Sequence, residues 1–251
     1  MNTSREKIEK IMFSFDLGFS DFYKDENVRQ LTLQGKLDKL EQATELMKFE
    51  EYMNYSIFNK KGPKHPTAEI YAIDFPSDFR ASVYLLLGGY YRQAILCLRN
   101  WLEIRLTGIY FGFINPDVEQ YEEWKKGRKW APIGRGLIKK LFSRAEFHKI
   151  DNKVRLRERL GNLMAELSAF THGSILEKYD LQSKTDNVPR FNPQSADLWF
   201  DFALRVFGEL VFCYFLAYGQ DAFEIGKEDL EILRHYLPEI YQKELQKSGI
   251  L

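Results

Sequence analysis

The stretch from Arg80 to Phe111 is long and mostly apolar, yet charged side chains interrupt it at a helical spacing. On a helix that turns by roughly 100° per residue, Arg92, Arg99 and Glu103 share an arc about 40° wide. Most of the remaining surface is Leu, Ile, Tyr, Trp or Ala, and a helix that is apolar on most sides is buried. Because a buried charge is costly unless it is paired, we expect this helix to carry a polar seam into the core.

The composition favours one large domain around this helix. The chain has 251 residues, of which 45% are hydrophobic, so it can bury a sizeable core. Cys97 and Cys213 both lie in apolar helical patterns, which predicts buried thiols rather than a disulfide framework.

The N-terminal MNTSREKIEK has no apolar stretch typical of a signal peptide, and the apolar run at 207–219 is too short to span a membrane. We therefore expect a cytoplasmic protein without a membrane segment.

The N-terminal part predicts two helices. A short one is expected at 4–14, and a longer one from about Asn27 to Phe58. The longer helix carries one apolar row, which we expect to be buried on the core or on a second subunit. The row consists of Leu33, Leu37, Leu40, Thr44 and Met47.

The middle of the chain predicts two further long helices separated by short ones. The central helix is expected to run from Ser77 or Asp78 to about Phe113, with Gly88-Gly89 as a bend or a close helix crossing. Glycines and Pro132 in residues 117–150 predict short helices joined by turns. Another helix is then expected from Asp151 or Asn152 to His172, with Gly173 as its stop.

The C-terminal part predicts an apolar helix and a helical tail. The helix is expected from Ser195 or Asp197 to about Tyr218, and the tail from Lys227 is broken near Pro238. No series of strands is visible, so the sequence predicts an all-α fold in a single domain, 1–251.

A basic segment lies between the two central helices, although the net charge of the chain is zero. Residues 124–159 contain thirteen Lys or Arg and only three acidic residues. Such a segment attracts phosphates, and the interleaved Trp124 and Trp130 could stack on bases. The alternative is a solvated basic surface that acidic groups of the same chain or of a partner balance. The candidate phosphate-binding residues are Lys125, Lys126, Arg128, Lys129, Arg135, Lys139, Lys140 and Arg144.

The helix that ends at His172 has a face of small residues. At roughly 100° per residue, Gly161, Ala165, Ser168 and His172 share a face about 60° wide. A small face allows another helix to approach closely, so we expect His172 to lie near the polar seam of the central helix. An imidazole placed there can serve in acid–base chemistry or as a structural hydrogen-bonding group.

Other signatures of catalysis are absent from the sequence. His65, His148 and His235 are scattered, and no spacing of Cys, His, Asp and Glu resembles a zinc site. Gly134-Arg135-Gly136 lacks the Lys-Ser/Thr of a phosphate-binding loop. We therefore expect neither a metal nor a cofactor.

Two segments resemble the HEPN superfamily of prokaryotic helical domains. They are AILCLRNWLEIRL, which contains Arg99 and Glu103, and RLGNLMAELSAFTHGS, which contains Gly161-Asn162 and His172-Gly173. The resemblance is to a branch described as a domain of unknown function and found near defence genes. It implies a HEPN-like helical bundle at 77–218 with a basic insertion at 115–150. Extra helices would lie at 1–60 and 226–251.

The resemblance also implies functions for the two segments. It implies RNA cleavage, a toxin–antitoxin pair or antiviral defence, often by a dimer. Active HEPN ribonucleases carry an Arg, then four to six residues, then a His; here Ala165, Glu166 and Leu167 stand where that Arg would be.

Two functional hypotheses follow. In the first, the chain is a defence or toxin-type protein that binds RNA or a nucleotide through its basic segment. If it were a metal-independent endoribonuclease, His172 would be the acid or base, Arg99 would stabilise phosphate charge and Glu103 would orient the histidine. In the second, the chain is a non-catalytic helical module that docks on a partner protein or forms a homodimer.

Overall fold

The described part of the chain is entirely helical. The structure is a computed structural model that describes residues 19–74, 77–171, 190–219, 222–223, 225–249 and 251. Within these ranges every regular element is a helix and no strand occurs, so the predicted all-α fold is confirmed. The helix expected at 4–14 lies outside the described residues. No helix in the described ranges combines the length and the apolarity that crossing a membrane requires.

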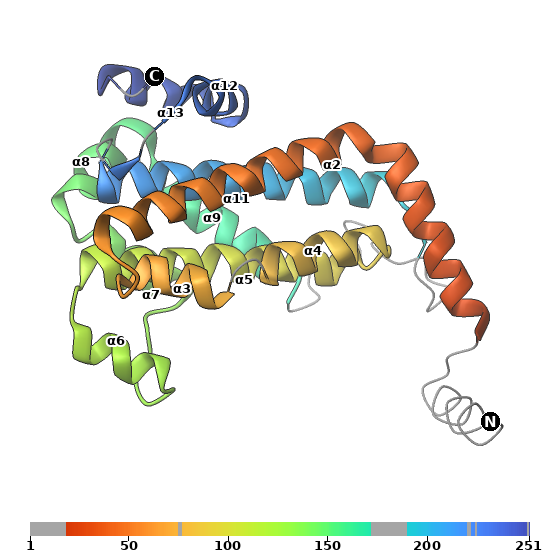
Figure 1. The fold of residues 1–251 in the computed structure, drawn as a ribbon, viewed down its shortest axis with the longest axis horizontal. Coiled ribbons are helices and arrows are strands. Elements are labelled where there is room, and N and C mark those ends of the chain that lie inside the picture. The colour runs from red at the N-terminus through yellow and green to blue at the C-terminus, as the bar shows by residue number, and fades with distance from the viewer. Residues whose placement is uncertain (1–18, 75–76, 172–189, 220–221, 224, 250) are drawn as a thin grey trace.

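The helices pack around α5, which lies in the predicted central stretch. In chain order they are α2 (Phe19–Lys61), α3 (Pro66–Asp74), α4 (Ser77–Leu87), α5 (Tyr91–Ile109), the π-helix η1 (Tyr110–Ile114), α6 (Val118–Lys125), α7 (Gly134–Leu141), α8 (Ala145–Val154), α9 (Leu156–Ala169), α11 (Pro193–Tyr218), α12 (Lys227–Tyr236) and α13 (Glu239–Lys247). Helix α5 packs against α3, α4, α9 and α11. Figure 1 shows α2 and α11 running along the long axis, with α12 and α13 together at one end.

The prediction of one continuous central helix is wrong, because α4 and α5 form a hairpin at Gly88-Gly89. The Tyr90 N–H donates to the Leu85 carbonyl at 2.8 Å, and the Gly89 N–H donates to the Leu86 carbonyl at 3.0 Å. These two bonds form a Schellman motif, which requires a left-handed residue, and Gly89 has a φ of +79°. The glycine pair therefore ends one helix and reverses the chain, where the apolar pattern on both sides predicted only a bend.

The helix expected from Asp151 or Asn152 to His172 is wrong at its start, because α9 begins only at Leu156. Helix α8 ends at Val154, and Arg155 has a φ of +54° at the junction with α9. The Asp151 side chain caps the start of α9, because its Oδ1 accepts the Arg157 N–H of the first turn at 2.8 Å. Neither Gly nor Pro marks this break in the sequence. His172 and Gly173 lie outside the described residues.

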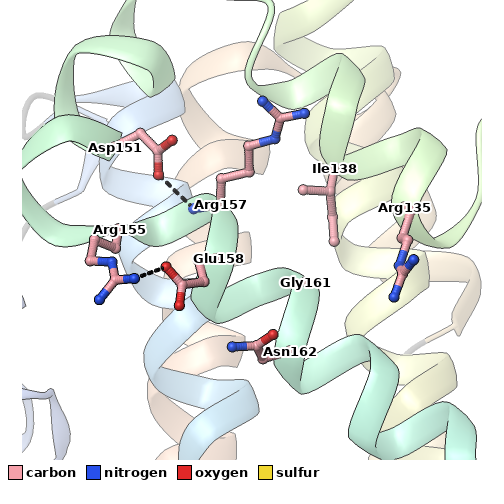
Figure 2. A pocket seen from close by; sticks show the side chains of 8 residues that line it. All are labelled: Arg135, Ile138, Asp151, Arg155, Arg157, Glu158, Gly161 and Asn162. Atoms are coloured by element: carbon pink, nitrogen blue, oxygen red, sulfur yellow. Dashed lines mark hydrogen bonds and ion pairs between the residues drawn. The ribbon is translucent and has the colours of Figure 1, made fainter.

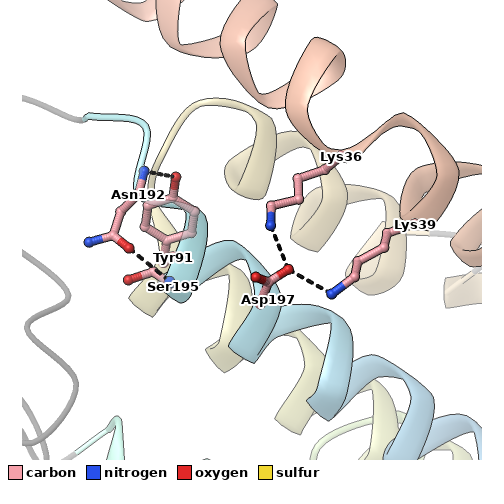
Figure 3. Close-up of polar contacts among 6 residues, drawn as sticks. All are labelled: Lys36, Lys39, Tyr91, Asn192, Ser195 and Asp197. Carbon is pink, nitrogen blue, oxygen red and sulfur yellow. Dashed lines mark hydrogen bonds and ion pairs between the residues drawn. The ribbon is translucent and has the colours of Figure 1, made fainter.

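Helix α2 is kinked where it passes the start of α11. Lys36 has a non-helical φ of −138°, and a Cβ on the adjacent Gly35 would lie 3.1 Å from the Phe191 ring. The Nζ atoms of Lys36 and Lys39 each lie 2.6 Å from Asp197 Oδ1 on α11 (Figure 3). One carboxylate therefore binds both the lysine at the kink and a lysine that follows it by three residues. Burial raises the pKa of Asp197, but the hydrogen bonds from both lysines outweigh it and lower that pKa.

The face of α2 that packs on the core is not the predicted row. The buried apolar side chains of α2 include Ala43, Leu46, Phe49, Met53 and Ile57. The predicted row of Leu33, Leu37, Leu40, Thr44 and Met47 lies beside this face, and Leu33, Leu37 and Thr44 are exposed. The expectation that the chain's own core buries this row is therefore wrong for its first half and for Thr44.

The π-helix η1 extends α5 into a crowded region. A Cβ on Gly112 would lie 2.6 Å from both His65 Cε1 and Thr67 Oγ1, and 2.7 Å from the Tyr218 hydroxyl. Thr67 Oγ1 in turn donates to the Gly108 carbonyl at 2.8 Å. Only a residue without a side chain fits at Gly112. Burial lowers the pKa of His65, although a hydrogen bond with the Gly112 backbone opposes it.

A buried carboxylate joins the C-terminal helix to the rest of the fold. Glu209 on α11 is 4% exposed, and it accepts from Arg159 Nε at 3.0 Å and from the Tyr241 hydroxyl. The Tyr241 ring stacks on Phe212 with centroids 4.0 Å apart. Helix α13 is thus attached to α11 and α9 by both polar and apolar contacts. Burial raises the pKa of Glu209, while Tyr241 and Arg159 oppose the rise.

Candidate phosphate-binding site

The polar seam of α5 exists, but it faces α7 and α9 rather than the core. Arg99 and Glu103 form an ion pair at 3.2 Å, and their side chains are 25% and 17% exposed. Arg99 Nε donates to Ser168 Oγ on α9 at 3.0 Å, and Glu103 Oε1 accepts the Gly134 N–H of α7 at 2.7 Å. Both side chains thus hold neighbouring helices on α5.

Arg92 has a similar role at the end of α9. Its Nε donates to the Phe170 carbonyl at 2.9 Å and its guanidinium to the Thr171 carbonyl at 3.2 Å. These bonds satisfy carbonyls that a helix end leaves without partners. His172 follows Thr171 in the sequence and lies outside the described residues, so its predicted proximity to Arg99 and Glu103 stays a prediction.

The charge pair within the core is a different one, which the sequence did not single out. Arg105 Nε lies 2.6 Å from Glu50 Oε1, and their side chains are 3% and 5% exposed. Trp101 Nε1 also donates to Glu50 at 3.3 Å. Arg105 follows Glu103 by two residues on α5, so it points to another side of that helix. The expected seam into the core is therefore replaced by this buried pair.

The small face of α9 does not form a tight helix crossing along its length. Ser168 does meet Arg99, but Ala165 is exposed. A Cβ on Gly161 would meet nothing within 4 Å. The expected close approach of α5 is therefore wrong at Gly161 and Ala165. Gly161 instead leaves open space beside the basic segment.

Half of the predicted phosphate-binding residues are engaged by groups of the same chain. Lys125 pairs with Glu69 and Glu122, Lys126 and Arg128 pair with Glu123, and Arg144 donates to the carbonyls of Phe113 and Ile114. The charged groups of the other half have no hydrogen-bond or ion-pair partner within the part of the chain that the structure describes. These are Lys129, Arg135, Lys139 and Lys140.

The two tryptophans of the basic segment differ. Trp124 packs its ring against Phe111 and Tyr121, with centroids 5.3 Å and 5.9 Å away. It is part of the fold and is not free to stack on a base. Trp130 is 89% exposed and its ring is accessible.

One pocket in the basic segment combines unpaired arginines with open space. It has a volume of about 480 Å³ and lies between α7 and the junction of α8 with α9. Its lining residues, drawn in Figure 2, are Arg135, Ile138, Asp151, Arg155, Arg157, Glu158, Gly161 and Asn162.

Only some of the charged side chains in this pocket have partners. Glu158 pairs with Arg155, and Asp151 accepts a backbone N–H of α9. The guanidinium groups of Arg135 and Arg157 have no hydrogen-bond or ion-pair partner among the described residues. Figure 2 shows them on either side of Ile138, Arg135 on α7 and Arg157 near the start of α9.

The fold explains why these groups meet. The left-handed backbone at Arg155 turns the chain sharply, so that Asp151 before the turn and Arg157 after it lie at one pocket. The absence of a side chain at Gly161 keeps the middle of the pocket open. A planar guanidinium can bind a phosphate through two parallel hydrogen bonds. Arg135 and Arg157 therefore each offer a group that can bind the phosphate of a ligand at this pocket.

Sequence reasoning named Arg135 as a candidate but not Arg157 or Asn162. Arg135 comes from α7 and Arg157 and Gly161 come from α9, and the packing of α7 on α9 brings them to one pocket. A second pocket of about 340 Å³ is lined by Glu103 and Asp78 and, within the described part of the chain, by no Lys or Arg, so its lining is unsuited to phosphate. Among the described residues, no group of three His, Cys, Asp or Glu side chains could hold a metal ion.

Comparison with models of known protein families, with curated proteins and with solved structures gave no match for this chain. The assignment of a function therefore depends on the residues of the site and on the HEPN-like segments of the sequence.

Proposed function

We propose that this chain is a HEPN-like prokaryotic defence or toxin-type protein that binds RNA or a nucleotide through its phosphates. The observation that carries the proposal is the pocket between α7 and α9, with the unpaired guanidinium groups of Arg135 and Arg157. Lys139 and Lys140 on α7 extend the positive surface beyond it, and the exposed Trp130 offers a ring for base stacking.

Binding, rather than cleavage, is the function that the polar contacts favour. Catalysis by Arg99 requires a guanidinium that can meet a phosphate, yet Glu103 and Ser168 already engage it. Glu103 is likewise engaged by the start of α7. The Arg that precedes the His in active HEPN ribonucleases is absent from this sequence. We therefore expect RNA to be bound and left intact.

The test is a binding titration with fluorescently labelled single-stranded RNA, measured by anisotropy at increasing salt. Reversing both pocket charges, R135E with R157E, should lower the affinity at least about tenfold, because hydrogen bonds to charged groups contribute about 1.5–3 kcal/mol each. It should also make the salt dependence shallower, since fewer counterions are released. Unchanged affinity in this variant would contradict the proposal.

A matched control changes the same net charge elsewhere. Lys227 and Lys243 are exposed on α12 and α13, outside the basic segment, so K227E with K243E should leave binding close to wild type. Equal losses in both double variants would indicate attraction to net charge alone. Gel analysis of the same RNA tests the second point: cleavage that is lost in H172A at an unchanged melting temperature would contradict a binding-only function.

A further inference from the structure

The pocket beside Glu103 differs in its chemistry from the phosphate pocket. It lies between α4, α5 and the chain that joins α6 to α7, and its volume is about 340 Å³. The lining residues are Asp78, Asn100, Glu103, Ile104, Thr107, Trp124, Ala131 and Ile133. Two of them are carboxylates, and none of the described lining residues is Lys or Arg, so the pocket does not attract an anion.

The walls of this pocket suit a small ligand that is partly apolar. Ile104, Trp124 and Ile133 provide apolar surface from α5, from α6 and from the residue before α7. Ile133 is 63% exposed, so the fold leaves much of its side chain accessible. The volume is at the lower end of the range for small-molecule sites, about 300–1,000 Å³. A pocket of this size has room for one nucleobase.

The polar groups of the lining are mostly acceptors. Asp78 and Glu103 offer carboxylate oxygens, and both also make contacts within the chain. A carboxylate has about four acceptor positions, so these contacts leave room for further donors. Asn100 is exposed, and its amide group offers an N–H as well as a carbonyl. The pocket therefore favours a ligand edge with adjacent donors and one acceptor beside them.

Guanine is the common base whose edge has this pattern. Its N1–H and its N2 amino group stand side by side, so one carboxylate can accept from both, and its O6 can accept from an amide N–H. Adenine and cytosine place a ring-nitrogen acceptor next to their single amino group. Uracil has one N–H between two carbonyls. A carboxylate meets lone pairs on each of these three bases, so the lining selects against them.

The start of α7 connects this pocket to the phosphate pocket. Ile133 lines the first pocket and Arg135 lines the second, and only Gly134 lies between them in the chain. The Gly134 N–H donates to Glu103 Oε1 at 2.7 Å, which holds this start in place. The Cα atoms of Ile133 and Arg135 are therefore at most about 7 Å apart. A ribose separates a base from its phosphate on the same scale.

We propose that the pocket beside Glu103 binds the base of a guanosine nucleotide whose phosphate meets Arg135. This inference rests on the proposed function, because it requires a nucleotide or RNA at the phosphate pocket. Asp78 accepts from N1–H and from the N2 amino group, since each oxygen of Glu103 already accepts from one group of the chain. Asn100 donates to O6. The guanosine is either a free nucleotide or part of a single strand of RNA.

The experiment is isothermal titration calorimetry of the full chain with the 5′-monophosphates of guanosine, inosine and adenosine (GMP, IMP and AMP). GMP should bind at least about tenfold more tightly than AMP, because paired hydrogen bonds discriminate between bases. IMP keeps N1–H and lacks the N2 amino group, so its affinity should lie between the two. GMP should also bind more tightly than guanosine, and R135A should remove that advantage because it removes the phosphate contact.

The variant D78N tests the residue that recognises the base. It replaces a carboxylate oxygen by an amide N–H, which opposes a donor of guanine, so GMP and AMP should bind with similar affinity. An unchanged affinity for AMP shows that the variant is folded. D38N is the matched control, since it removes the same charge from an exposed residue of α2 and should keep the preference for GMP.

Equal affinities of wild type for GMP and AMP, or a preference that D78N leaves unchanged, would overturn the base assignment. An advantage of GMP over guanosine that persists in R135A would overturn the link to the phosphate pocket. The proposed function would survive these results if RNA binding still depends on Arg135 and Arg157. Absence of binding to RNA and to every mononucleotide would overturn both.

Two short RNAs distinguish the sources of the guanosine. One is a pentanucleotide of adenosines, and the other has a guanosine at its centre. Tighter binding of the strand with guanosine assigns the pocket to a base within RNA. Equal binding of the two strands, together with a preference for GMP, assigns it to a free nucleotide.

Discussion

Replacing Glu209 tests how the C-terminal helices are held on the fold. Its carboxylate is buried and accepts hydrogen bonds from Arg159 and Tyr241. Because burial raises its pKa, the surroundings favour the neutral form of this side chain. Glutamine has the shape of the neutral form: its oxygen can accept from Arg159 and its amide N–H can donate to the Tyr241 hydroxyl, whereas alanine removes both contacts.

The expected magnitudes follow from the exposure of the partners. In E209A the fully buried Tyr241 hydroxyl loses its acceptor, while Arg159 is 37% exposed and can turn to water. An unsatisfied buried hydroxyl and the vacated space together should reduce the free energy of unfolding by about 3 kcal/mol. For a chain of this size that corresponds to a melting temperature lower by about 6–12 °C. E209Q should stay within about 1 kcal/mol of wild type at neutral pH.

The stability of wild type relative to E209Q also depends on pH. Below the ordinary carboxyl pKa of 4.5, Glu209 is protonated in both the folded and the unfolded chain. As the pH rises through the raised pKa, the folded chain must ionise a buried group and loses stability relative to the unfolded chain. The stability of wild type relative to E209Q should therefore be greatest at low pH and fall as the pH rises.

Thermal unfolding monitored by circular dichroism measures the stability loss in E209A and the pH dependence of wild type relative to E209Q. Hydrogen exchange shows which helices are destabilised. In E209A the amides of α13 should exchange faster than those of α5. An E209A protein as stable as wild type, or a wild-type stability that rises relative to that of E209Q as the pH rises, would refute this account of the buried carboxylate.

Two further predictions concern the framework of the fold. G112A should lower the melting temperature by about 2–12 °C, because overpacking at three fixed side chains costs about 1–3 kcal/mol, whereas G136A in the open surface of α7 should raise it by about 2–4 °C. D197A should speed hydrogen exchange around Lys36 and cost no more than about 1–2 kcal/mol, since the side chains of Asp197 and Lys39 are partly exposed. Because the pKa of Asp197 is lowered, its contribution should disappear as the pH falls below 3.8. Equal melting temperatures for the two glycine variants, or exchange at the kink that D197A leaves unchanged, would contradict these predictions.

The helices themselves could be predicted from the sequence, because their spacing and their breaks are local signals. The apolar run to Tyr218 and the tail broken near Pro238 are confirmed as α11, α12 and α13. The hairpin at Gly88-Gly89 could not be told from a bend, since the sequence is helical and apolar on both sides. The break at Arg155 carries no Gly or Pro at all.

The site was less predictable, because its chemistry depends on which charges find partners. Lys125, Arg135 and Arg144 are all basic residues of the same segment, and the sequence does not distinguish them. In the structure Lys125 pairs with acidic groups of α3 and α6, and Arg144 donates to a carbonyl at the end of η1. Trp124 and Trp130 likewise differ only in what packs on them. For Leu37, periodicity indicated an apolar face but not that the chain itself leaves it exposed.

The most direct test of phosphate binding at the α7–α9 pocket keeps the charge and changes only the geometry. The measurement is the RNA affinity of R135K with R157K beside that of wild type. If the two guanidinium groups bind phosphate by paired hydrogen bonds, lysines should not replace them, and the affinity should fall about tenfold or more. Equal affinity of the lysine variant and wild type would contradict a site built on these arginines.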